Sequence, residues 1–192
     1  MRRFFSRMAR SLRKRWLSAV FRLKNQDGRV RKDGRLWLHV PLLCDGAGSV
    51  SLAAGISIGF GPAPMLGDGT VRLQARGINS RIEVGKGTSF SNNVQVIAEE
   101  RVTIGEHCLI GDAVLILDSD FHNLSPSSRH NLPGLSAPVI LGDNVFVGSR
   151  SIILKGVTIG KDSVIGAGSV VVRSIPPGVI AAGNPAKVIR PL

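Results

Sequence analysis

The chain has 192 residues, of which 43% are hydrophobic and 20% charged, so it can bury a core and is not a disordered protein by composition. Aromatic residues make up only 5%, Tyr is absent and Gly occurs 23 times, a composition that favours a thin, regularly coiled β architecture over a helical bundle. No apolar run approaches the roughly 20 residues that cross a bilayer. The two cysteines, Cys44 and Cys108, lie far apart, which argues against a disulfide framework and a structural zinc site.

Basic residues are concentrated at the start of the chain. The first 24 residues contain nine Lys and Arg and no Asp or Glu. The other 168 residues carry 16 basic and 13 acidic side chains, a net charge of only +3. A nucleic-acid-binding protein is expected to carry its basic residues on a face of the folded body, so these counts argue against nucleic acid as a partner.

Residues 1–24 have the pattern of a basic amphipathic helix. Apolar residues recur at steps of three and four, at Phe4, Phe5, Met8, Leu12, Trp16, Val20 and Leu23. The other face carries Arg3, Arg7, Arg10 and Lys14. This arrangement predicts a helix that lies flat on an anionic membrane, as a peripheral contact at the inner face of the cytoplasmic membrane. Two alternatives stay open: the stripe docks on the body or on a neighbouring subunit, or the segment is a mitochondrial-type targeting peptide.

A six-residue repeat dominates the rest of the chain. Residues 25–35 are polar, contain two Asp-Gly turn signals and predict a linker, which leaves 36–192 as one domain. From Leu141 the chain divides into LGDNVF, VGSRSI, ILKGVT, IGKDSV, IGAGSV and VVRSI. The first position is aliphatic each time and the fifth is small or β-branched. An earlier tract that begins at Val84 follows the same pattern.

A period of six fits neither an amphipathic helix nor an alternating strand, but it does fit a short strand followed by a tight corner. Three such units close a triangular coil of about 18 residues, with the aliphatic first residue pointing inward, and successive coils pair in parallel at about 4.8 Å. The repeat therefore predicts an all-β fold, a parallel β-helix.

The repeat, together with the closing sequence Gly-Asn-Pro-Ala-Lys-Val-Ile-Arg at 183–190, resembles the hexapeptide-repeat acyltransferase family. The resemblance is closest to the branch of polysaccharide and galactoside O-acetyltransferases and covers roughly residues 80–192. It implies a left-handed β-helix, acetyl-CoA as donor substrate without a metal, and a homotrimer with active sites between subunits.

The sixes fail between Ile116 and Val139, where a loop at 118–138 is inserted. Its Asp118–Asn123 segment resembles the family's active-site loop, which makes His122 the catalytic histidine. A sugar hydroxyl attacks a thioester only if its proton is removed, and imidazole suits that task. Asp120 is the nearest candidate to orient the second ring nitrogen. His130, in the same loop, is a weaker candidate.

The resemblance also carries over residues that contact the acceptor and coenzyme A. Asn92 matches an acceptor-binding Asn, against the alternative of a corner Asn in a left-handed turn. Glu100 falls where the galactoside branch has an Asp that contacts the acceptor, against the alternative of a solvated surface charge. The coenzyme-A contacts correspond to Phe146, Ser149, Ala167, Arg173, Lys187 and Arg190, with a backbone N–H near Ser149 as oxyanion donor.

Rival functions have less support. Cys108 occupies an inward fifth position, which favours a core residue over a nucleophile. A γ-type carbonic anhydrase needs two closely spaced histidines, which the four here do not provide. The sequence thus predicts a cytoplasmic O-acetyltransferase that acts on a sugar hydroxyl of a cell-surface polysaccharide or its precursor. The alternatives are N-acetylation of an amino sugar and, in a different class, a non-catalytic β-helix scaffold recruited to membranes.

Overall fold

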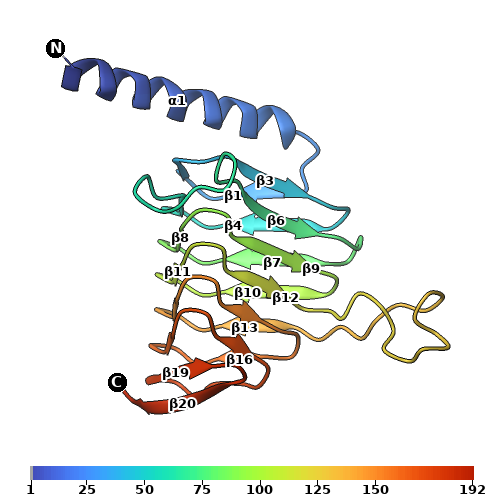
Figure 1. Cartoon of the computed structure of the whole chain (residues 1–192). Coiled ribbons are helices and arrows are strands. Elements are labelled where there is room, and N and C mark those ends of the chain that lie inside the picture. Colours follow the sequence, from blue (N-terminus) through green and yellow to red (C-terminus); the bar gives the residue numbers. More distant parts are fainter. Residues whose placement is uncertain (1) are drawn as a thin grey trace.

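The computed structural model describes the backbone of residues 2–192 and the side chains of residues 12, 13 and 15–192. Helix α1 (Arg2–Lys24) lies across one end of a stack of β coils, and the hairpin of β19 and β20 closes the other end (Figure 1). The helices in the described part of the chain include none long and apolar enough to span a membrane.

Three sheets form the sides of the coils. Sheet A contains β1 (Val30–Lys32), β4 (Ser49–Leu52), β7 (Arg81–Val84), β10 (Arg101–Ile104), β13 (Val139–Leu141) and β16 (Thr158–Ile159). Sheet B contains β2 (Trp37–Leu38), β5 (Ser57–Ile58), β8 (Ser89–Phe90), β11 (Leu109–Ile110), β14 (Phe146–Val147), β17 (Val164–Ile165), β19 (Val179–Gly183) and β20 (Ala186–Pro191). Sheet C contains β3 (Leu42–Asp45), β6 (Val71–Ala75), β9 (Gln95–Ala98), β12 (Leu115–Leu117), β15 (Ile152–Ile153) and β18 (Val170–Val171).

The strand register confirms the predicted coil. Leu141 pairs with Ile159 and Val147 with Ile165, so equivalent positions return after 18 residues, and these strands run parallel. The chain departs from parallel pairing at β19 and β20, which are antiparallel. One coil thus visits sheets A, B and C in turn, as the repeat of three sixes requires.

The inward positions predicted from the repeat form the core. The six aliphatic first positions between 141 and 171 are at most 1% exposed. The serines among the small fifth positions are also buried, and each finds a backbone acceptor at a corner: Ser151 Oγ and Ser169 Oγ donate to the carbonyl of Gly166, and Ser163 Oγ donates to that of Pro176. Small hydroxyls fit these narrow positions because the adjoining corner satisfies them.

Helix α1 packs on the first coil through a face that differs from the predicted stripe. Leu17 and Phe21 are buried and belong to the core, whereas Leu12, Trp16 and Leu23 are 58–69% exposed. The open end of a β-helix leaves inward side chains uncovered, and Leu17 and Phe21, one helical turn apart, cover them here. The side chains predicted further along the stripe, Phe4, Phe5 and Met8, lie outside the described residues, as do those of Arg3, Arg7, Arg10 and Lys14.

The segment at 25–35, expected to be a linker, contributes β1 to sheet A. Val30 and Lys32 pair with Val50 and Leu52 of β4. Three residues with one partly buried side chain carry too weak an alternation to be recognised in the sequence.

Candidate active site

The loop at 118–138 leaves the body at the corner between sheets C and A and reaches away from it (Figure 1). A buried carboxylate fixes its base. Asp118, with no exposed surface, accepts hydrogen bonds from the backbone N–H groups of Glu99, Glu100 and Arg101 at 2.7–2.8 Å. Ala137 N–H donates to the Asp118 carbonyl at 2.9 Å, so both ends of the loop meet at this residue. A charge-assisted anchor of this kind compensates for the turn stacking that the insertion removes.

The backbone of the loop presents His122 to solvent. The His122 N–H donates to the Asp120 carbonyl at 2.7 Å, and Phe121 adopts a left-handed φ of 61°. The returning strand crosses close behind, where a Cβ on Gly134 would lie 2.8 Å from the backbone N and O of His122. Gly134 is therefore required for this approach. The imidazole is exposed and has no hydrogen-bond or ion-pair partner within the described residues.

Asp120 does not hold the imidazole of His122 in the way we expected. Its Oδ1 lies 3.0 Å from Nζ of Lys155, a residue in the turn between β15 and β16 of the next coil. Its Oδ2 is buried and has no hydrogen-bond partner within the described chain. The carboxylate therefore pairs with a cation below the loop, and its contact with His122 is through the backbone. Lys155 is a residue of this site that the sequence analysis missed.

Glu100 lies beside the base of the loop. Its side chain is exposed, and its Oε2 accepts a hydrogen bond from Ser136 Oγ at 3.2 Å. Its neighbour Glu99 forms an ion pair with Arg76 at 3.7 Å, and the Arg76 guanidinium stacks 4.3 Å from the ring centroid of Phe121. Glu100 thus belongs to the same corner of the molecule as His122.

Asn92 has a structural role in the chain, which differs from the acceptor contact that we expected. It is fully buried, its Oδ1 accepts from the Phe60 N–H at 3.0 Å, and its Nδ2 lies 3.2 Å from the carbonyls of Phe60, Ala63 and Pro64. Its amide is saturated by the loop that follows β5, so no group is left for a ligand. The left-handed corner residue is its neighbour Asn93, with φ of 61°.

The residues predicted to contact coenzyme A lie mainly on sheet B. Phe146 pairs with Val164, Val164 with Ile180, and Ile180 with Arg190, so these side chains form one column across β14, β17, β19 and β20. Phe146 is 44% exposed and Arg190 is exposed, so the outer surface of the column is apolar at one end and cationic at the other. Three strand spacings separate them, about 14 Å.

Ser149 and Ala167 follow this column at the corner between sheets B and C. They lie on successive coils, joined by a hydrogen bond from Gly168 N–H to the Ser149 carbonyl at 2.9 Å. The Ser149 N–H itself has no acceptor within the described residues. Lys187 is exposed on β20, opposite Ala182, whereas Arg173 follows β18 at the corner between sheets C and A.

The structure thus divides the predicted site between two corners. His122, Asp120, Glu100 and Arg173 lie at or near the corner between sheets C and A. Phe146, Ser149, Ala167, Lys187 and Arg190 lie on sheet B or at its corner with sheet C. Sheet C separates the two groups, so a single chain does not bring them together.

Comparisons with known proteins agree with this fold and site. A model of the hexapeptide repeat of succinyl-transferase matches residues 138–173. Galactoside O-acetyltransferase of Escherichia coli K12 is 42% identical over 111 residues, which are 58% of this chain and 54% of that protein. The putative lipopolysaccharide biosynthesis O-acetyl transferase WbbJ of the same strain is 36% identical over 148 residues, 67% of this chain and 76% of WbbJ. The chain belongs to the hexapeptide-repeat acyltransferase family.

Solved structures of the family extend the likeness over nearly the whole chain. Galactoside acetyltransferase in complex with coenzyme A has a TM-score of 0.61 and 27% identity, and covers 95% of this chain and 80% of that one. A maltose O-acetyltransferase from Clostridium difficile 630 has a TM-score of 0.60 and 25% identity, and covers 93% and 86%. The left-handed parallel β-helix predicted from the resemblance is confirmed. By sequence, however, the chain spans only about half the length of the galactoside enzyme that it matches.

Neither cysteine is suited to nucleophilic chemistry in this acyltransferase fold. Cys108 is fully buried, and burial raises the pKa of its thiol. Burial, with a further contribution from the Asp45 carboxylate, raises the pKa of the Cys44 thiol to about 12. Both thiols stay protonated at neutral pH, and the thiolate is the nucleophile. Among the described residues no three His, Cys, Asp or Glu side chains cluster as metal ligands.

Proposed function

We propose that the protein transfers the acetyl group of acetyl-CoA to a hydroxyl of a cell-surface polysaccharide or of its saccharide precursor. The similarity to a lipopolysaccharide O-acetyl transferase over two thirds of the chain favours this acceptor class. The similarity to a galactoside acetyltransferase bound to coenzyme A favours the donor.

The observation that carries the proposal is the division of the site between two corners. His122 projects from one corner with an unengaged imidazole, and Ser149 N–H is free at another. Two chains related by a threefold axis can bring the His122 corner of one against the sheet B column of the next. We therefore infer a homotrimer in which each active site lies between neighbouring subunits.

In this mechanism His122 acts as the general base. It takes the proton of the sugar hydroxyl as the oxygen bonds to the thioester carbonyl carbon, and the neighbouring subunit's Ser149 N–H stabilises the oxyanion. The carbon–sulfur bond then breaks, the carbonyl reforms, and the departing thiolate receives a proton from His122. No covalent acyl-enzyme forms. The exposed cations Lys187, Arg190 and Arg173 bind the phosphates of the donor.

Substitution of the histidine tests the proposal. His122→Ala should lower kcat by on the order of 10²–10⁴ while acetyl-CoA still binds, because the base is lost and the donor surface is untouched. His130→Ala is the matched control, since His130 is also exposed in the same loop. Turnover of His122→Ala at the wild-type rate would contradict the assignment. The acceptor is then identified by screening nucleotide sugars and oligosaccharides for added acetyl mass, and acetylation of amines alone would replace O-transfer by N-transfer.

A further inference from the structure

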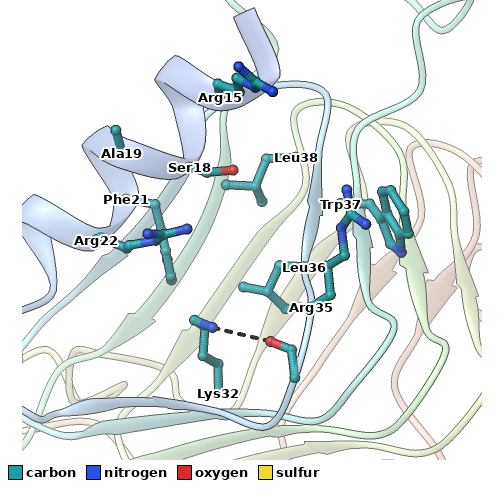
Figure 2. Close-up of a pocket in the computed structure, with 11 residues that line it drawn as sticks. Arg15, Ser18, Ala19, Phe21, Arg22, Lys32, Arg35, Leu36, Trp37 and Leu38 are labelled. Atoms are coloured by element: carbon teal, nitrogen blue, oxygen red, sulfur yellow. Dashed lines mark hydrogen bonds between the residues drawn. The ribbon is translucent and has the colours of Figure 1, made fainter. Parts of the chain in front are cut away.

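A cavity of about 760 Å³ lies between α1 and the first coil, at the opposite end of the stack from the β19–β20 hairpin. Four basic residues line it: Arg15 and Arg22 from the helix, Lys32 from β1 and Arg35 from the turn that follows (Figure 2). Phe21, Leu36 and Leu38 form its apolar lining, and no acidic residue contributes to it. Its volume lies in the range of about 300–1,000 Å³ that is typical of small-ligand sites.

The four cations have no counter-charge. Lys32 Nζ donates only to the carbonyl of Gly34, at 3.2 Å, and the Arg35 guanidinium stacks on the Trp37 ring at 3.8 Å from its centroid. Neither they nor Arg15 and Arg22 form an ion pair with any residue that the structure describes. Like charges around one cavity repel one another, and a bound anion relieves that repulsion. The cavity therefore has the chemistry of a phosphate site.

The helix itself indicates where the phosphate comes from. Arg15, Ala19 and Arg22 follow one another at steps of four and three, so they share the flank of α1 that faces the cavity. The adjacent flank carries Leu12, Trp16 and Leu23, all more than half exposed. A cationic flank beside an apolar one, in a segment with nine basic residues and no acidic ones, matches the boundary between lipid headgroups and acyl chains.

We propose that this cavity binds the phosphate of an anionic lipid headgroup while Leu12, Trp16 and Leu23 insert among the acyl chains. The lipid source is favoured over a soluble phosphate because a soluble ligand would leave the apolar flank uncovered. The site is separate from the proposed acetyl-transfer chemistry and does not depend on it. It would hold the first coil against the membrane and leave the far end of the β-helix in solution.

The test compares two double variants of the full chain in binding to phosphatidylcholine vesicles with and without phosphatidylglycerol. R22Q/R35Q removes two cavity cations, one on α1 and one on the first coil. R13Q/R31Q removes the same charge from the same two regions, but neither residue lines the cavity. Diffuse attraction to the surface depends on charge alone, at roughly fivefold in affinity per residue, and would weaken both variants equally. A built site predicts that R22Q/R35Q loses at least about tenfold more than R13Q/R31Q.

Equal losses, or no preference of the wild type for vesicles with phosphatidylglycerol, would overturn the proposal. Release of the protein by soluble glycerol 3-phosphate would also overturn it and would identify a soluble phosphate ligand. If R22Q/R35Q changes the oligomeric state in light scattering, the cavity is an interface with a second copy. We expect wild-type assembly, and wild-type acetyl transfer to a soluble acceptor, in both variants. A failure of the lipid site is thereby distinguishable from a failure of the proposed enzymatic activity.

Discussion

The corner between sheets B and C and the corner between sheets C and A are built by different physical means. At the first, consecutive coils stack so closely that a Cβ on Gly111 would lie 2.6 Å from the Ser149 nitrogen, and one on Gly148 would lie 2.5 Å from the Ala167 nitrogen. At the second, one coil opens into the loop at 118–138, and the buried carboxylate of Asp118 takes over from stacking. The stacked corner fixes backbone positions, whereas the open corner leaves a side chain free to act.

The largest effect is expected at the open corner. Asp118→Asn replaces one acceptor oxygen by a donor that faces backbone N–H groups, so the loop base loses its anchor. We expect the free energy of unfolding to fall by about 2–4 kcal/mol and kcat to fall at least about 100-fold, because His122 is no longer held in place. Denaturant unfolding and steady-state kinetics measure the two effects.

Asp162→Asn serves as the control for that substitution. Asp162 is exposed at a regular corner and accepts a hydrogen bond from Asn144 Nδ2 at 2.9 Å. Its change should stay within about 0.5 kcal/mol. If both variants unfold alike, Asp118 is not a special anchor of the loop.

The stacked corner should respond to volume and leave the chemistry intact. Gly148→Ala inserts a methyl group against the backbone of the next coil, which cannot move without separating the strands. We expect a loss of about 1–3 kcal/mol in the free energy of unfolding. Gly61→Ala, where the added methyl group meets nothing within 4 Å, should leave stability unchanged or slightly raised. Equal behaviour of the two glycines would contradict the packing described here.

A smaller effect is expected for the ion pair beneath the loop. Lys155→Met leaves the Asp120 carboxylate partly buried and unpaired, which should shift the backbone that carries His122 and lower kcat about tenfold with KM little changed. Lys155→Arg should restore most of the rate, because it keeps the charge. Lys161→Met, which removes an exposed lysine of the same coil, should have no effect. A rate unaffected by Lys155→Met would show that the pair with Asp120 has no positioning role.

The difference between the corners also explains how much could be predicted from the sequence. The inward aliphatic residues from Leu141 to Val171 repeat locally, so the coil, its length and the inserted loop follow from the sequence alone. Contacts that depend on which coil lies beneath which were missed. Lys155 follows Ala137, the end of the loop, by 18 residues, and counting one coil back would have placed it below the loop.

Two further differences arose from competing patterns. Leu17 and Phe21 are one turn apart on a helix whose longer stripe of apolar residues was the stronger signal, yet they are the pair that covers the core. Asn92 matched a family position by sequence, but its amide is used by the loop after β5. Neither burial nor hydrogen-bond saturation can be read from a motif.

Subunit mixing tests the central claim that two chains share each active site. His122→Ala removes the base, and Ala167→Trp blocks the donor surface at the other corner, so each variant alone should be inactive. When the two are co-expressed in equal amounts, random homotrimer assembly pairs an intact His122 corner with an intact Ala167 corner in about a quarter of the sites. Recovery of about a quarter of the wild-type rate is the predicted result. No recovery from mixed trimers of confirmed composition would contradict a site shared between subunits.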